Sequence, residues 1–164
     1  MAPYAELRVV RIAELLPRAE DEPAWLIESL WGMGAVGVIG GAPKSCKSWL
    51  ALEMAVAVAS GQPCLGRFKI TSPGTVLVCA AEDAPQQVRE RIEHVARSRG
   101  AEFEQLDVRL IVEATLRLDR GDDVQRLHAT LKRHRPKLLV LDPWVRLQRV
   151  HENDATEVSA ILAT

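Results

Sequence analysis

Residues 35–60, AVGVIGGAPKSCKSWLALEMAVAVAS, decide the fold of this chain. The stretch begins with a short apolar run containing Val36, Val38 and Ile39, continues through a glycine-rich turn and ends in an alanine-rich apolar segment. Short β-branched runs are typical of buried strands, whereas a longer apolar segment after a turn predicts a helix. We therefore expect a strand, a loop and a buried helix in this order.

This order suits a phosphate-binding site. Backbone N–H groups of such a loop and the N-terminus of the helix carry partial positive charge, to which a lysine adds a full charge. A serine hydroxyl directly after the lysine can ligate magnesium. The pattern G-x-x-x-x-G-K-[ST] maps onto residues 41–48, which we call the phosphate loop. Its candidate nucleotide-binding residues are Gly41, Ala42, Pro43, Lys44, Ser45, Cys46, Lys47 and Ser48.

One position of the phosphate loop departs from the pattern, because Cys46 stands where the second glycine belongs. Glycine is favoured where the backbone must approach a ligand closely, so a Cβ and a thiol are expected to crowd the turn or the phosphate path. The alternative interpretation is a glycine-rich turn that merely joins a strand to a helix. Gly41, Lys47 and Ser48 all match the pattern in the correct context, which favours the nucleotide site.

The composition is that of one ordinary globular domain. The 164 residues are 48% hydrophobic and 26% charged, and the formal net charge of -1 provides no global basic surface for nucleic acid. No apolar run reaches the length of a membrane span, so we expect a cytoplasmic protein without a membrane partner. The three cysteines lack the clustered spacing of a disulfide framework or a zinc site.

A second strand, at residues 75–80, is followed by two carboxylates, Glu82 and Asp83. Pro85 and Gln86 come next, in the spacing that predicts Asp83 as the N-cap of a helix. Glu82 is then left at the carboxyl end of a parallel strand, where ligands of open α/β sheets bind, and it could activate a water as a general base. The alternative is a solvated loop carboxylate.

A further strand, KLLVLD at residues 137–142, ends in Asp142, whose carboxylate could hold a magnesium-bound water. Between the two carboxylate-tipped strands lie another strand candidate at residues 108–112 and a helix from about Asp123. Strands therefore alternate with helices along the chain. This alternation predicts an α/β fold with a largely parallel sheet of four or five strands flanked by helices.

Together, GGAPKSCKSWLALEMAVAVASG, VLVCAAED and KLLVLDPWVRL followed by ENDATEVSAIL resemble the RecA-like P-loop ATPase domain of RepA-type hexameric helicases, an AAA-type ATPase. The resemblance covers about residues 25–164. It implies that Lys47 and Ser48 are the Walker A lysine and the magnesium-ligating serine. It also implies that Asp142 is the Walker B aspartate and Glu82 the catalytic glutamate. ATP and Mg²⁺ are the implied cofactors, and single-stranded DNA and a homo-hexamer the implied partners.

The resemblance also predicts a domain organisation. Residues 1–34 are expected to form an N-terminal adaptor segment and residues 35–164 a partial RecA-like domain, because a further central strand and an arginine finger follow in the family. We expect weak nucleotide binding and slow hydrolysis from this chain. Two alternatives are a non-catalytic nucleotide-binding or interaction module and a small P-loop kinase, for which Arg117 and Arg120 are available as lid residues.

Overall fold

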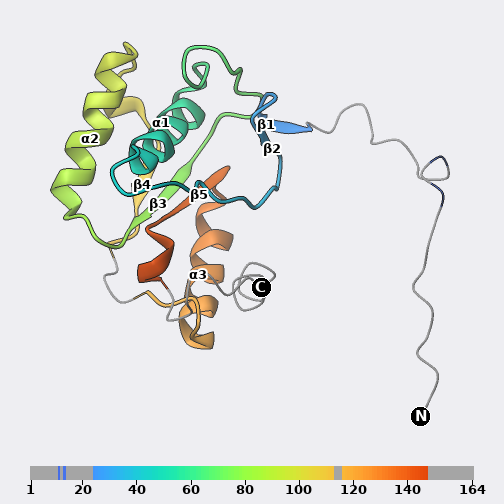
Figure 1. The fold of residues 1–164 in the computed structure, drawn as a ribbon, viewed down its shortest axis with the longest axis vertical. Coiled ribbons are helices and arrows are strands. Elements are labelled where there is room, and N and C mark those ends of the chain that lie inside the picture. Colours follow the sequence, from blue (N-terminus) through green and yellow to red (C-terminus); the bar gives the residue numbers. More distant parts are fainter. Residues whose placement is uncertain (1–10, 12, 14–23, 113–115, 148–164) are drawn as a thin grey trace.

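The computed structural model describes residues 11, 13, 24–112 and 116–147 (Figure 1). Its centre is a three-stranded parallel sheet in which β3 lies between β4 and β5. These strands are β3 (Val76–Ala80), β4 (Val108–Leu110) and β5 (Leu138–Asp142). All three occur where the sequence predicts them, and the α/β class is confirmed.

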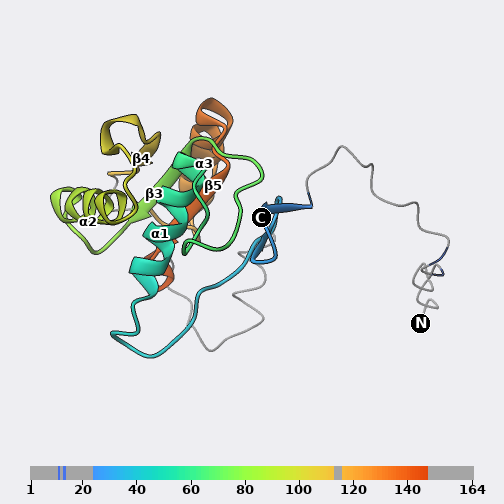
Figure 2. The ribbon, with the colours of Figure 1, turned by 90° about the horizontal axis from the view of Figure 1, so that it is seen from above.

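Three helices flank the sheet, and Figure 2 shows α1 and α2 on one side of it and α3 on the other. They are α1 (Lys47–Ser60), α2 (Pro85–Ser98) and α3 (Gly121–His134). Two short 3-10 turns, η2 (Phe103–Gln105) and η3 (Trp144–Arg146), follow α2 and β5. A helix on each connection between parallel strands is the arrangement that buries both faces of such a sheet.

The main hydrophobic core lies between the sheet and the α1–α2 layer. Val76 and Val78 point to this side because successive residues of a strand face opposite ways, while Cys79 packs in a second cluster with Leu116 and Leu147. The middle of α1, from Met54 to Val58, is almost fully buried. Helix α1 therefore contributes a large part of the main hydrophobic core.

A small antiparallel pair precedes the phosphate loop, formed by β1 (Trp25–Ile27) and β2 (Trp31–Gly32). Leu26 and Ile27 are buried in the main core, and Ile27 also forms a bridge with Ile70. The described part of the predicted N-terminal segment thus packs against the rest of the domain. The domain boundary after residue 34 stays a prediction.

The strand expected around Val36, Val38 and Ile39 is the main error of the sequence-based prediction. These residues form no strand, and the side chains of Val36 and Val38 are each 69% exposed. A strand needs a neighbour for its N–H and C=O groups, and within the described residues β5 pairs only with β3. The described sheet therefore has three strands rather than four or five.

Two other expectations concern the ends of the chain and membranes. The ENDATEVSAIL segment that contributes to the resemblance begins at Glu152 and lies outside the described residues. Among the residues that the structure does describe, no helix has the length and apolar character needed to cross a bilayer.

Candidate functional site

The phosphate loop leads directly into the first turn of α1. The Leu50 N–H donates the first helical hydrogen bond to the Cys46 carbonyl at 3.0 Å. Lys47, the first helical residue, folds back over the loop, and its ammonium Nζ donates to the carbonyls of Gly41 and Ala42, at 2.9 Å each. The lysine charge is thus held across the concave side of the loop, next to the positive end of the helix.

The backbone of the loop explains two of its sequence positions. At Gly41 an added Cβ would lie 2.9 Å from the Ser45 Oγ, so a larger residue would require the Ser45 side chain to move. Lys44 and Cys46 both have left-handed conformations, with φ of 63° and 62°. For a residue with a Cβ this conformation costs roughly 1 kcal/mol or more. Cys46 therefore carries a backbone penalty in addition to any crowding by its exposed thiol.

Ser48 and Asp142 lie on the walls of one narrow hollow, between the start of α1 and the end of β5. Their positions follow from the fold, because β5 runs beside β3 with Asp142 opposite Ala80, and the Ala81 N–H donates to the Asp142 carbonyl at 2.8 Å. The sequence-predicted serine and aspartate are thus brought together, 94 positions apart in the chain.

The same hollow contains two residues that the sequence analysis did not place in the site, Asp83 and Arg91. The prediction that Asp83 caps α2 is wrong, because Ala84 is the N-cap and makes no side-chain cap hydrogen bond. The Arg91 guanidinium instead holds both carboxylate oxygens of Asp83, at 2.5 and 3.1 Å. This fork-to-fork pair orients Asp83 at the wall of the hollow.

Glu82 follows β3 at the same edge of the sheet. Its Oε1 accepts a hydrogen bond from Arg146 Nε of η3 at 2.7 Å, and both side chains are substantially exposed. The sequence analysis missed this contact because the two residues are 64 positions apart and no spacing rule links them. As the side chains stand, the Glu82 carboxylate is engaged by a cation.

Two side chains at the hollow, those of Ser48 and Asp142, are of the type that binds magnesium, whereas most of the other lining residues are apolar. Ser48 offers a hydroxyl and Asp142 a carboxylate, and hard oxygen donors of this kind, completed by waters and substrate phosphates, are what Mg²⁺ takes in nucleotide sites. The described residues contain no group of three or more His, Cys, Asp or Glu side chains able to hold a metal without such additional ligands.

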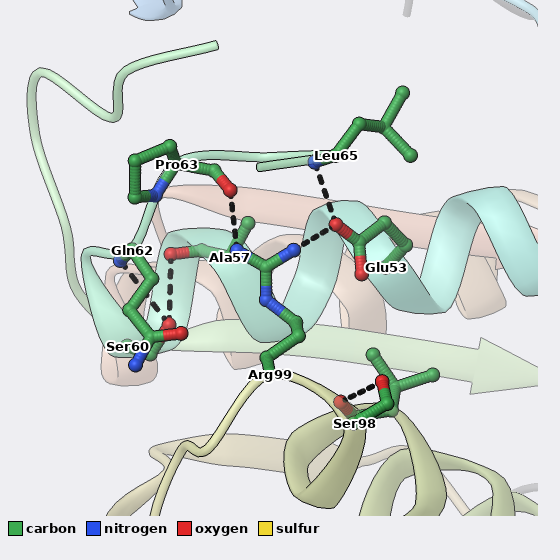
Figure 3. Close-up of polar contacts among 9 residues, drawn as sticks. Glu53, Ala57, Ser60, Gln62, Pro63, Leu65, Ser98 and Arg99 are labelled. Atoms are coloured by element: carbon green, nitrogen blue, oxygen red, sulfur yellow. Dashed lines mark hydrogen bonds and ion pairs between the residues drawn. The ribbon is translucent and has the colours of Figure 1, made fainter. Parts of the chain in front are cut away.

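The middle of α1 is held by Arg99, which follows α2 (Figure 3). The Arg99 guanidinium forms an ion pair with Glu53 of α1 and donates to the Pro63 carbonyl, while Glu53 also accepts from the Leu65 N–H at 2.7 Å. We call these four residues the Arg99 bracket. Beside it, burial and then the Glu53 charge raise the pKa of the Cys64 thiol to about 11.

Comparison with known proteins identifies the family. A family model for an AAA domain matches residues 3–164, nearly the whole chain. Neither the curated proteins nor the solved structures give a match. The family match agrees with the parallel sheet, the Lys-Ser pair at the start of α1 and the aspartate at the end of β5. This chain belongs to the AAA domain family.

Proposed function

We propose that this chain binds ATP with Mg²⁺ at the phosphate loop and hydrolyses the nucleotide slowly. The observation that carries the proposal is the position of Lys47, whose ammonium lies across the loop at the start of α1. Ser48 and Asp142 share a hollow beside it. A cation, a helix N-terminus and two oxygen ligands in one place are the components of a nucleotide triphosphate site.

In this proposal the loop residues act mainly by position and charge. Lys47 exchanges its two carbonyl contacts for phosphate oxygens and stabilises the negative charge that moves during phosphoryl transfer. Ser48 and Asp142 hold the magnesium, which when bound neutralises phosphate charge. Glu82 orients and deprotonates the attacking water. For that task the Glu82 carboxylate must first leave Arg146.

A non-catalytic nucleotide-binding module is the second candidate. The Glu82–Arg146 contact favours it, because the Glu82 Oε1 that could receive a proton from water already accepts a hydrogen bond from Arg146 Nε. The left-handed conformation of Cys46 also favours it, because the loop keeps a strained residue where the pattern has glycine. No contact described above favours the small P-loop kinase. Transfer of phosphate to an acceptor other than water would support the kinase instead.

We also propose the finer role of a RepA-type helicase domain that couples hydrolysis to single-stranded DNA as a homo-hexamer. Its support is the resemblance of the motif blocks. Stimulation of phosphate release by single-stranded DNA, together with a hexamer mass in solution, would test it. Unstimulated turnover by a monomer would contradict it for this chain.

The nucleotide proposal is tested by isothermal calorimetry with ATP and Mg²⁺ on the parent chain, Lys47→Ala and Lys132→Ala. We expect Lys47→Ala to weaken binding about 100-fold, since charge-assisted hydrogen bonds contribute about 1.5–3 kcal/mol each. Lys132 is an exposed lysine on α3, outside the phosphate loop, and serves as the matched control, so its loss should leave the affinity unchanged. Equal affinity of all three proteins would contradict the site.

Phosphate release separates the two candidate functions. Slow release by the parent chain that is abolished in Glu82→Gln, with ATP binding kept, supports the ATPase. Binding without any release supports the non-catalytic module. Rapid, DNA-stimulated release would contradict our expectation of slow turnover.

A further inference from the structure

A larger hollow, of about 580 Å³, lies on the flank of α1 that faces α2. Its wall begins at Cys46 of the phosphate loop and continues through Trp49 and Glu53 of α1, Leu65, and His94 of α2. Apart from Cys46, these residues do not belong to the proposed phosphate site. The hollow is a shallow, open depression rather than an enclosed cavity, so a flat ring bound in it would keep part of its surface in solvent.

Aromatic and apolar surface is accessible inside this hollow. The Trp49 side chain is 41% exposed, and its indole forms a T-shaped pair with the His94 ring, with ring centroids 6.0 Å apart at 74°. Leu65, on the same wall, is 55% exposed. An indole that is held by an aromatic neighbour and still partly open to solvent is a stacking surface for a flat heteroaromatic ring.

We propose that this hollow receives the nucleobase of the nucleotide whose phosphates the loop binds, with the base stacked on Trp49. The inference rests on the proposed function, because it takes the phosphate end of the ligand to lie at Lys47. The new content is a base subsite on the α2-facing flank of α1, with Trp49 as its main contact.

The position of Trp49 supports this assignment. Trp49 is the third helical residue, and three residues of α-helix span only about 4.5 Å along the axis, less than the length of a nucleoside triphosphate. Cys46 is common to the phosphate loop and the wall of the hollow, so the two sites are continuous. A ligand with its phosphates at the helix N-terminus can therefore place its base in the hollow without leaving the protein surface.

The test compares ATP with inorganic tripolyphosphate, which has the phosphates but no base, both with Mg²⁺, by calorimetry. We expect Trp49→Ala to bind ATP about tenfold more weakly than the parent chain and tripolyphosphate equally well. Trp25→Ala is the matched control, because Trp25 on β1 is also 41% exposed. Trp49→Phe keeps an aromatic ring and should retain most of the ATP affinity.

Each result decides the proposal. Unchanged ATP affinity in Trp49→Ala, or an equal loss for ATP and tripolyphosphate, would overturn the base subsite while leaving the phosphate site intact. Failure of the parent chain to bind either ligand would overturn both proposals. If Trp49→Ala does not fold, tryptophan fluorescence of the parent chain tests the base subsite instead. ATP should quench more of the tryptophan emission than tripolyphosphate does. Trp49→Phe should remove this difference between the two ligands.

Discussion

The N-terminus and the middle of α1 have opposite structural character. At its N-terminus the helix emerges from a loop with two left-handed residues, Lys44 and Cys46, and the Lys47 ammonium donates hydrogen bonds to two loop carbonyls. In the middle of the helix, Glu53 is tied through Arg99 to the end of another helix and to another loop (Figure 3). One helix thus combines an exposed, strained N-terminus with a buried, cross-linked middle.

This difference shows how the domain separates binding from stability. A site is positioned well when the element that supports it is held by packing and hydrogen bonds away from the ligand. The buried middle of α1 and the Arg99 bracket provide that support, so the phosphate loop can keep an unfavourable conformation. Substitutions in the phosphate loop should therefore change mainly the affinity for phosphates, whereas substitutions in the Arg99 bracket should change mainly the free energy of unfolding.

The largest expected effect is at the Arg99 bracket. Arg99→Met leaves the Glu53 charge without its partner, and both side chains are less than 15% exposed. We expect the free energy of unfolding in urea to fall by about 3 kcal/mol, because removing one member of a buried pair leaves an uncompensated charge. The affinity of the folded fraction for tripolyphosphate with Mg²⁺, which reports the phosphate loop alone, should stay unchanged.

Two controls sharpen this prediction. Arg97→Met removes an exposed pair with Glu93, in which Arg97 is 75% exposed, and should change stability by less than about 1 kcal/mol. Adding Glu53→Gln to Arg99→Met should recover part of the loss. A fall in tripolyphosphate affinity as large as the fall in stability would erase the distinction between the phosphate loop and the Arg99 bracket.

A smaller effect is the pH dependence of the free energy of unfolding that arises from Cys64, beside the Arg99 bracket. The folded state raises the pKa of Cys64 from 9.0 to about 11, so above pH 9 the unfolded chain loses this proton while the folded chain keeps it. The free energy of unfolding should fall between pH 9 and 11, by at most about 1.4 kcal/mol per pH unit. Urea titrations should show a flatter decline for Cys64→Ala. An equal slope in both proteins would contradict the assignment.

At the loop end the expected change is about 1 kcal/mol and favourable. Cys46→Gly removes the cost of a left-handed residue with a Cβ, so stability should rise and ATP affinity should improve up to about fivefold. Cys46→Ala keeps the Cβ and should give no comparable gain. If alanine and glycine improved affinity equally, the thiol rather than the backbone would be the obstacle.

The smallest effect is expected at Arg146, beside the loop. Arg146→Ala frees Glu82 from an exposed ion pair, and such pairs contribute about 0–1 kcal/mol. We expect steady-state phosphate release to rise up to about fivefold, with unchanged unfolding free energy. A fall in turnover would mean that Arg146 holds Glu82 in its working position.

The sequence predicted the elements whose signal is local. Helix α1 and strands β3 and β5 follow from apolar runs that are bounded by turns or by charged residues. The Lys47–Ser48 pair was also recognisable, because its spacing is fixed within a few residues. The family match nearly spans the chain and agrees with this reading.

The sequence could not predict what depends on a distant partner. Val36 and Val38 have the composition of a strand, but a strand also requires a neighbour, which is absent among the described residues. Asp83 has the spacing of an N-cap, yet Arg91 offers it a bidentate contact that competes with capping. The approach of Trp49 to His94 likewise exists only once α1 and α2 pack together.

The engaged position of Lys47 also has a kinetic consequence. A nucleotide that reaches the loop meets an ammonium already bonded to two carbonyls, so association requires an encounter followed by a rearrangement of the lysine. Rates measured by stopped flow should then level off at high ATP concentration, at the rate of that rearrangement. The lysine that supplies the binding charge would in this way also set the speed at which the site fills.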